Sequence, residues 1–164
     1  MRAVVMVVLA LAFSSSLAQE RETLTFKSTK VTVPPCGRAL VQPQSGGTIT
    51  LLPDQVACFA LKVTDGRIQL TDPPKSAAPE NLLVLKLWYV PEAGKSFLSI
   101  HNPLSQFLTY KAHILRVGAK SLEYTTTCPV LSRRDGLEFW TYALSEITIS
   151  DLALAPESKT IECH

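Results

Sequence analysis

The stretch FLSIHNPLSQFLTYKAHIL, residues 97–115, decides the fold class of this chain. Before the polar corner at Asn102 and Pro103, Leu98 and Ile100 alternate with polar residues. After the corner, every second residue is again apolar or aromatic: Leu108, Tyr110, Ala112 and Ile114. Successive side chains of a β-strand point to opposite faces, so this period of two indicates two strands with one buried face each. The corner between them fits either a hairpin or an arch that crosses between sheets.

Strand-like segments separated by turn residues recur along the rest of the chain. Residues 56–64 and 67–71 flank Asp65-Gly66, a dipeptide typical of two-residue hairpin turns. The segment LLVLKLWYV, residues 82–90, is apolar at both parities, which is typical of a strand buried on both faces. Further strands are expected at residues 23–33, 48–52, 122–126 and 146–154.

One segment, LEFWTYALSEI at residues 137–147, carries a helical period instead. Leu137, Trp140, Leu144 and Ile147 recur at intervals of three and four, which predicts a short helix before the last strand. Strand patterns nevertheless dominate, and the sequence contains no long amphipathic helical segment. The sequence therefore predicts an all-β fold, a sandwich or barrel of antiparallel strands.

The pattern SIHNPLSQFLTYKAHI, residues 99–114, resembles part of the immunoglobulin-like sandwich domains of exported bacterial proteins, including chaperone-like ones. In that pattern an Asn ends one strand, here Asn102, and a Leu and an aromatic residue follow in the next, here Leu108 and Tyr110. The resemblance implies an immunoglobulin-like antiparallel β-sandwich for the second half of the chain and implies no activity. The chain lacks a Trp placed between two cysteines at the spacing of antibody domains.

Residues 1–18 have the pattern of a secretory signal peptide, with a positive start, an apolar run and small residues at Ser16 and Ala18. The apolar run is shorter than the roughly 20 residues that cross a bilayer. We expect cleavage near Ala18 and an exported mature chain, in a bacterial periplasm or, as the rival, secreted to the medium. An uncleaved membrane anchor is the alternative, and no later segment is apolar enough to span a membrane.

The mature chain, residues 19–164, is predicted to be a single domain. TDPPKSAAPEN, residues 71–81, contains three prolines and no periodicity, so we expect a long loop or linker there. If this segment is a linker, the chain divides into residues 19–70 and 82–164.

The chain has four cysteines, and none lies in the predicted signal peptide. An even number in an exported chain favours two disulfides. We expect the pairs Cys36–Cys58 and Cys128–Cys163, because each pair lies within one half of the chain. A zinc site or a redox pair would call for short Cys-x-x-Cys spacings, which the sequence lacks.

Charge and motif content argue against several functions. The net charge of +2 falls further when the signal peptide is removed, and no Lys/Arg cluster is present to bind nucleic acid. No nucleophile motif or phosphate loop occurs, and we expect no cofactor and no metal. Carboxylates that could serve a glycosidase lie at turns or at outward parity, where solvated charge is the default: Glu123, Asp135, Glu138 and Glu146.

Two histidines suggest one further possibility. His101 and His113 both occupy the polar parity of their strands, and they would lie close together if the two strands paired. Such a pair would invite a metal or an acid–base role. The simpler interpretation is two solvated surface histidines.

Surface recognition remains as the preferred function. Four aromatic residues beside turns are candidates for a contact surface, with core packing as their alternative role: Phe107, Phe139, Trp140 and Tyr142. The favoured hypothesis is a non-catalytic exported protein, an assembly factor or inhibitor, that binds another envelope protein. It predicts an exposed aromatic patch or an open sheet edge. The alternative is a small exported hydrolase or ligand-binding protein, which predicts a concave polar pocket.

Overall fold

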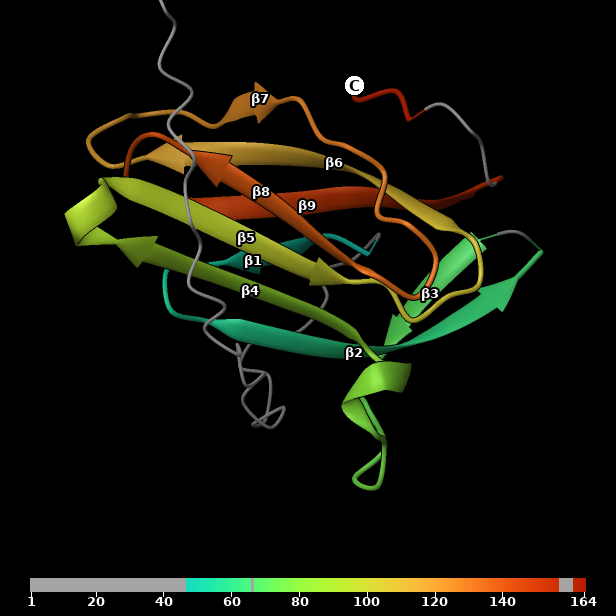
Figure 1. Ribbon diagram of the computed structural model, residues 1–164. Helices are drawn as coiled ribbons and strands as arrows, with labels where there is room; N and C mark the ends of the chain where they lie inside the picture. Colours follow the sequence, from blue (N-terminus) through green and yellow to red (C-terminus); the bar gives the residue numbers. More distant parts are fainter. Residues whose placement is uncertain (1–46, 66, 157–160) are drawn as a thin grey trace, which may run out of the picture. The chain divides into compact units, whose positions relative to one another are not determined.

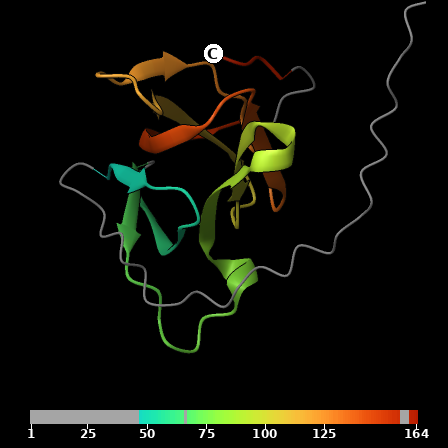
Figure 2. The same ribbon diagram turned by 90° about the vertical axis from the view of Figure 1, so that its left-hand side faces the viewer.

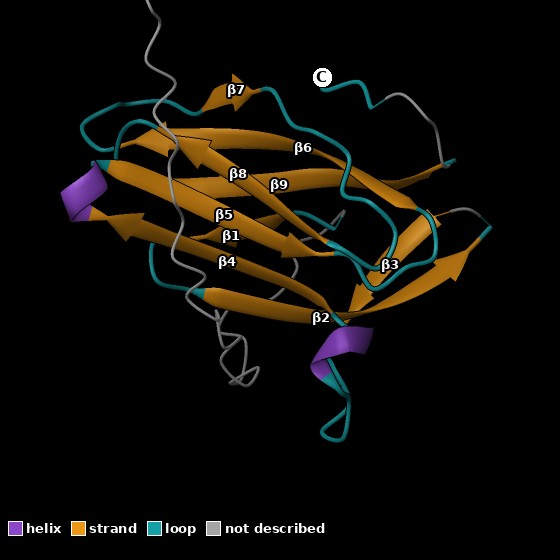
Figure 3. Cartoon of the chain, viewed as in Figure 1, coloured by secondary structure: helices purple, strands orange, loops and turns teal. Residues whose placement is uncertain are grey.

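The computed structural model describes residues 47–65, 67–156 and 161–164 of the chain. All of them belong to one compact unit, Val33–His164. Strands dominate this part of the chain, and the only helices among its residues are two single 3₁₀ turns, η1 (Pro79–Asn81) and η2 (Pro91–Ala93) (Figures 1 and 3). The strands are β1 (Ile49–Leu51), β2 (Val56–Thr64), β3 (Arg67–Thr71), β4 (Leu83–Val90), β5 (Lys95–His101), β6 (Phe107–Arg116), β7 (Glu123–Thr125), β8 (Asp135–Trp140) and β9 (Leu144–Ala155).

The strands form one antiparallel sheet in the order β7-β6-β9-β3-β2-β4-β5-β8, with β1 added beside β9. β2 turns the corner of this sheet, because residues 56–59 pair with β4 whereas residues 60–64 pair with β3. The sheet curls as a result, and Figure 2 shows the curl from the side. Buried side chains of β4, β5 and β8 meet those of β1, β6 and β9 in one core. The all-β prediction is confirmed.

The alternation in residues 97–115 is also confirmed. Leu98 and Ile100 of β5 are buried in the core, as are four residues at every second position of β6: Leu108, Tyr110, Ala112 and Ile114. The strand predicted to be buried on both faces is β4. Leu83 and Leu85 face the main core, and Val84 packs on the opposite side in a small cluster with Cys58 and Leu82.

The corner after β5 is an arch. β5 lies between β4 and β8, whereas β6 lies between β7 and β9, so the two strands do not pair with each other. Asn102 is fully buried in this arch. Its Nδ2 donates to the backbone carbonyls of Gln106 (2.9 Å), Val130 (3.0 Å) and Leu131 (3.0 Å), and its Oδ1 accepts from the Leu104 N–H (3.0 Å). An amide supplies an acceptor and two N–H donors, one of them shared here between two carbonyls, and among side chains of this length only Asn offers both, which explains the Asn.

The predicted short helix over residues 137–147 is wrong, because β8 and β9 occupy these positions with a turn at residues 141–143 between them. Leu137 points outward, while Trp140, Leu144 and Ile147 are buried. The helical spacing arose because one strand ends and another begins within the window.

Other sequence predictions have mixed outcomes. β2 and β3 form the predicted hairpin, with Asp65 at a φ of 51°. The proline-rich loop joins β3 to η1, and β2 before the loop pairs with β4 after it, so the described residues on its two sides share one sheet. The predicted signal peptide, the strand at residues 23–33 and Cys36 lie outside the described residues. No helix among the described residues is long and apolar enough to span a membrane.

Candidate interaction surface

Three aromatic side chains form a row across the outer face of β4, β5 and β8. The strand register places Trp88 opposite Phe97 and Phe97 opposite Phe139. The Trp88 and Phe97 rings stack with centroids 5.4 Å apart and planes 17° apart, and the Phe97 and Phe139 centroids are 6.3 Å apart. We call these three residues the aromatic row. It links strands that are distant in sequence into one continuous surface.

A lysine lies at each end of the aromatic row. The Lys86 ammonium is 5.3 Å from the centroid of the Trp88 ring, and the Lys95 ammonium is 5.5 Å from that of Phe139. Both distances are within the range of cation–π attraction. Within the part of the chain that the structure describes, neither lysine forms an ion pair with a carboxylate. The row therefore presents positive charge that an acidic partner surface would complement.

Exposure along the row increases toward β8. Trp88 and Phe97 are half-buried, whereas Phe139 is 57 % exposed. Leu137, two residues earlier on the same face of β8, is 56 % exposed. Large apolar side chains that gather on a surface, rather than standing singly, are typical of contact sites.

The edge of β8 beyond Phe139 is open. β8 is the last strand of the sheet and pairs only with β5 among the described strands. The Asn102 N–H donates to the Arg134 carbonyl at 2.9 Å, which sets the alternation of the ladder between these strands. It follows that the backbone groups facing away from β5 belong to Asp135, Leu137 and Phe139. In the described part of the chain these outward groups have no backbone partner.

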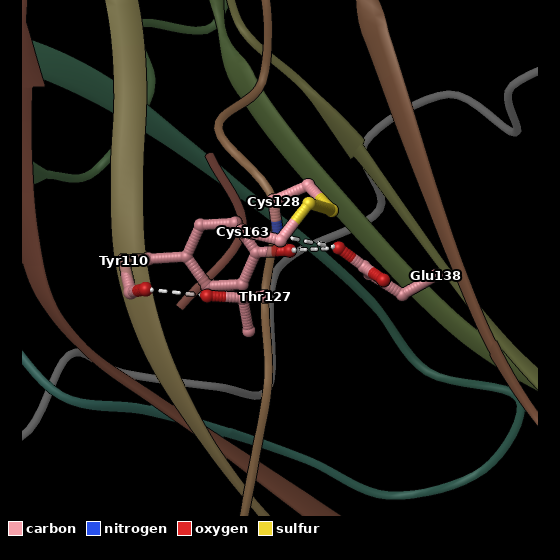
Figure 4. The surroundings of a disulfide bond; sticks show 5 residues. All are labelled: Tyr110, Thr127, Cys128, Glu138 and Cys163. Carbon is pink, nitrogen blue, oxygen red and sulfur yellow. Dashed lines mark hydrogen bonds between the residues drawn. A yellow bond between two sulfur atoms is a disulfide. The ribbon is translucent and has the colours of Figure 1, made fainter. Parts of the chain in front are cut away.

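Side-chain hydrogen bonds cover the inner face of β8, and we call this group of contacts the seal. The Glu138 carboxylate accepts from the Cys128 N–H (3.0 Å) and from the Tyr110 hydroxyl (3.3 Å), as Figure 4 shows. The Trp140 indole N–H donates to Thr125 Oγ1 (3.0 Å). Burial first, and then the charge and hydrogen bond of Glu138, raise the pKa of Tyr110 above its ordinary range. The hydroxyl is thus held as a neutral donor and not as a base.

The C-terminus is fastened beside this seal (Figure 4). Cys128 and Cys163 form a disulfide, the predicted pairing. Next to it, Thr127 and His164 exchange two backbone hydrogen bonds of 2.7 and 2.9 Å. Cys58 is also disulfide-bonded, and its predicted partner Cys36 lies outside the described residues, so that pairing stays a prediction.

The structure separates the four predicted contact residues. Phe139 lies in the aromatic row. Trp140 is only 8 % exposed and faces the core, so its predicted role at a surface is corrected. Tyr142 packs partly against the core, with the Arg116 guanidinium 5.2 Å from its ring centroid, and Phe107 is half-buried on β6, outside the β4-β5-β8 layer.

Sequence reasoning missed Trp88, Phe97 and Leu137 as surface residues. Trp88 shares the parity of Lys86, and Phe97 shares the parity opposite to the buried Leu98. These parities could have placed both side chains on the outer face. We instead assumed that a strand as apolar as β4 is buried along its whole length.

The two histidines are not brought together by strand pairing, since β5 and β6 do not pair. His101 Nδ1 lies 2.7 Å from an Asp135 carboxylate oxygen, and its Nε2 lies 3.3 Å from the Glu80 carbonyl. Both ring nitrogens are therefore engaged. His113 instead meets Tyr124 edge to face, with centroids 5.7 Å apart. Across the described ranges, no three metal-ligating side chains gather at one place.

The other carboxylates considered from the sequence also have local partners. Glu123 forms an ion pair with Arg116 at 2.6 Å, and Glu146 accepts from the Thr148 hydroxyl at 3.3 Å. No two of Glu123, Asp135, Glu138 and Glu146 share a hydrogen-bonding partner in the described part of the chain. Their arrangement gives no support to a pair of cooperating acids.

Among the described residues, a depression lies between β3 and β9, with a volume of about 300 Å³. Its charged lining groups, Arg67 and Asp151, are exposed, and Asp151 pairs with Lys111 at 2.9 Å. A ligand site would be expected to hold converging, desolvated polar groups, and this depression does not. No protein-family model, curated protein or solved structure matches the chain.

Proposed function

We propose that this chain is an exported, non-catalytic β protein that binds another protein of the cell envelope through the aromatic row and Leu137. The observation that carries this proposal is the exposure of Phe139 and Leu137, side by side on an edge strand. Aromatic side chains are the commonest anchors of protein interfaces. The two lysines at the ends of the row favour a partner whose contact face carries carboxylates.

The ring geometry favours a protein partner over a sugar or a flat ligand. Such ligands stack on the open face of an aromatic ring. Here Trp88 and Phe97 cover each other, and the ammonium groups of Lys86 and Lys95 lie over Trp88 and Phe139. The row offers ring edges and aliphatic lysine stems, which apolar side chains of a protein can pack against.

The finer fold and the location belong to the same proposal. The arch between β5 and β6, and the way β2 takes part in both layers, support an immunoglobulin-like β-sandwich. The Cys128–Cys163 disulfide supports an oxidising compartment, hence the periplasm or the medium. An assembly factor or an inhibitor would suit a rigid protein of this kind.

The proposal is tested by crosslinking the tagged protein in its native cell envelope and identifying what it captures. We compare the wild-type chain with Phe139→Ala and Lys95→Glu. The matched control is Tyr124→Ala, because Tyr124 is an aromatic residue of similar exposure (53 %) on β7. Thermal unfolding confirms that each variant is folded.

Support consists of one identified partner with an acidic contact face that is lost with Phe139→Ala and Lys95→Glu and kept with Tyr124→Ala. If Phe139→Ala captures that partner as well as the wild-type chain does, the aromatic row is not the contact surface and the proposal fails.

A further inference from the structure

The open edge of β8 constrains which strand can pair with it. Its outward backbone groups belong to Asp135, Leu137 and Phe139, whose side chains all lie on the outer face. A strand that pairs there must direct its own free backbone groups at these residues and keep its outer-face side chains on the outer face. A second copy of β8, running antiparallel, meets both conditions when the register is centred on Leu137, and charge then favours this register.

We infer that two copies of this chain pair through β8, with Leu137 facing Leu137 of the second copy and Asp135 facing its Phe139. This inference goes beyond the proposed function, because the occupant is the same chain and the contact is the strand edge rather than the face of the row. Each facing pair exchanges both of its backbone hydrogen bonds. The exposed Leu137 side chains cover each other across the two-fold axis.

Charge complementarity supports this register. The Lys95 ammonium lies over the Phe139 ring at 5.5 Å, and Asp135 of the second copy faces Phe139 at the cross-strand distance of about 5.5 Å. Lys95 of each copy is therefore within reach of Asp135 of the other, twice by symmetry. The Asp135 side chain is 76 % exposed, and only one of its carboxylate oxygens is engaged, by His101.

The register centred on Glu138 is disfavoured by charge. Pairing centred on Glu138 would place two Glu138 carboxylates side by side, and like charges directly opposite are destabilising. In the register centred on Leu137, Glu138 faces Gly136 of the second copy, which has no side chain.

A cysteine placed at the centre of the proposed pair tests it directly. In this register the Cα atoms of the two copies of residue 137 are about 5.5 Å apart, within the range that a disulfide spans. On mild oxidation, the Leu137→Cys variant should therefore form a disulfide-linked dimer, and a reductant should convert it back to monomer. The matched control is Phe139→Cys, whose two copies would lie about 14 Å apart along the strands and should stay monomeric.

Sedimentation of the exported full chain tests the charges independently of any new thiol. Asp135→Lys and Lys95→Asp should each weaken association by about tenfold or more, and the double variant should restore it. Lys86→Asp, a control on the far end of the row, should leave association unchanged.

Three results would overturn the inference. The first is a wild-type chain that stays monomeric at about 0.1 mM. A dimer with a Kd of about 10 µM would be mostly associated at that concentration. Equal crosslinking of Leu137→Cys and Phe139→Cys, or failure of Leu137→Cys to crosslink, contradicts the register. These outcomes do not depend on the envelope partner. The crosslinking experiment in the envelope compares Tyr124→Ala with Phe139→Ala by the partner that each captures, and does not measure dimerisation.

Discussion

The two edge strands of the curled sheet, β7 and β8, differ in how their surroundings are fixed. At the β7 end, the Thr127–His164 backbone pair and the Cys128–Cys163 disulfide fasten the C-terminus to the residues that follow the strand. At the β8 end, the outward backbone groups have no strand beside them among the described residues, and Leu137 and Phe139 lie exposed. Proteins usually blunt or cover free edges, because an open edge recruits other strands. This difference between the two edges is why we propose the β8 end as the contact surface.

The largest loss of stability should come from removing the disulfide at the β7 end. Replacing Cys128 and Cys163 together by Ser removes a crosslink over a sequence separation of 35 residues. The loop-entropy model gives a loss of about 4 kcal/mol in the free energy of unfolding. Urea unfolding measures it, and a loss below about 1 kcal/mol would show that the disulfide does not secure this end.

The second-largest loss of stability should come from the arch that connects β5 to β6. Asn102→Ala removes the side-chain partner of three backbone carbonyls and one N–H, of which, among the described residues, only the Val130 carbonyl keeps another donor, the Leu108 N–H. We expect the free energy of unfolding to fall by about 3 kcal/mol. Asn81→Ala, at an exposed position of η1, is the matched control and should change it by less than about 0.5 kcal/mol. Equal effects of the two variants would rule out the arch as a structural anchor.

Alkaline pH should loosen the seal beneath β8. Because the pKa of Tyr110 is raised above its ordinary value of 10.0, the folded state holds a proton that the unfolded chain releases. Its contribution is complete below that value and declines as pH rises above it. Urea midpoints between pH 9 and 11 should therefore fall more steeply for the wild-type chain than for Tyr110→Phe. Tyr124→Phe, at an exposed tyrosine, should behave like the wild type, and parallel slopes for all three proteins would contradict the raised pKa.

The smallest effect on stability should come from the aromatic row. Phe139→Ala removes one cross-strand contact on an exposed face and should cost less than about 1 kcal/mol. Phe59→Ala, at a fully buried phenylalanine of β2, should cost about 3–5 kcal/mol. Thermal or urea unfolding compares the two. If Phe139→Ala lowers the free energy of unfolding nearly as much as Phe59→Ala does, the aromatic row stabilises the sheet and is not a free contact surface.

Much of the strand content could be predicted from local patterns. The alternation around Leu98 and Leu108 reports burial directly, and Asp65-Gly66 marks a turn that depends on its own residues. The helical period at residues 137–147 misled, because Trp140 and Leu144 belong to different strands that both happen to face the core. A window that spans a turn mixes two registers, and no local pattern separates them.

The candidate surface could not be predicted in the same way. It depends on β8 pairing with β5 across the intervening β6 and β7, and on a register that sets Phe139 beside Phe97. Such non-local pairing is decided by the packing of the whole core and not by the spacing of residues in one segment. The same limit explains why His101 and His113 looked like neighbours, although the arch at Asn102 leads from β5 to β6, two strands that do not pair with each other.

Residue-resolved amide hydrogen exchange of the full chain at β8 is the most direct test of the open edge. In dilute solution the account predicts rapid exchange at Leu137 and Phe139, whose N–H groups face away from β5, and slow exchange at Glu138, whose N–H faces it. Raising the protein concentration should protect Leu137 and Phe139. If both amides exchange as slowly as Glu138 in dilute solution, the edge is already covered and the account of this surface is wrong.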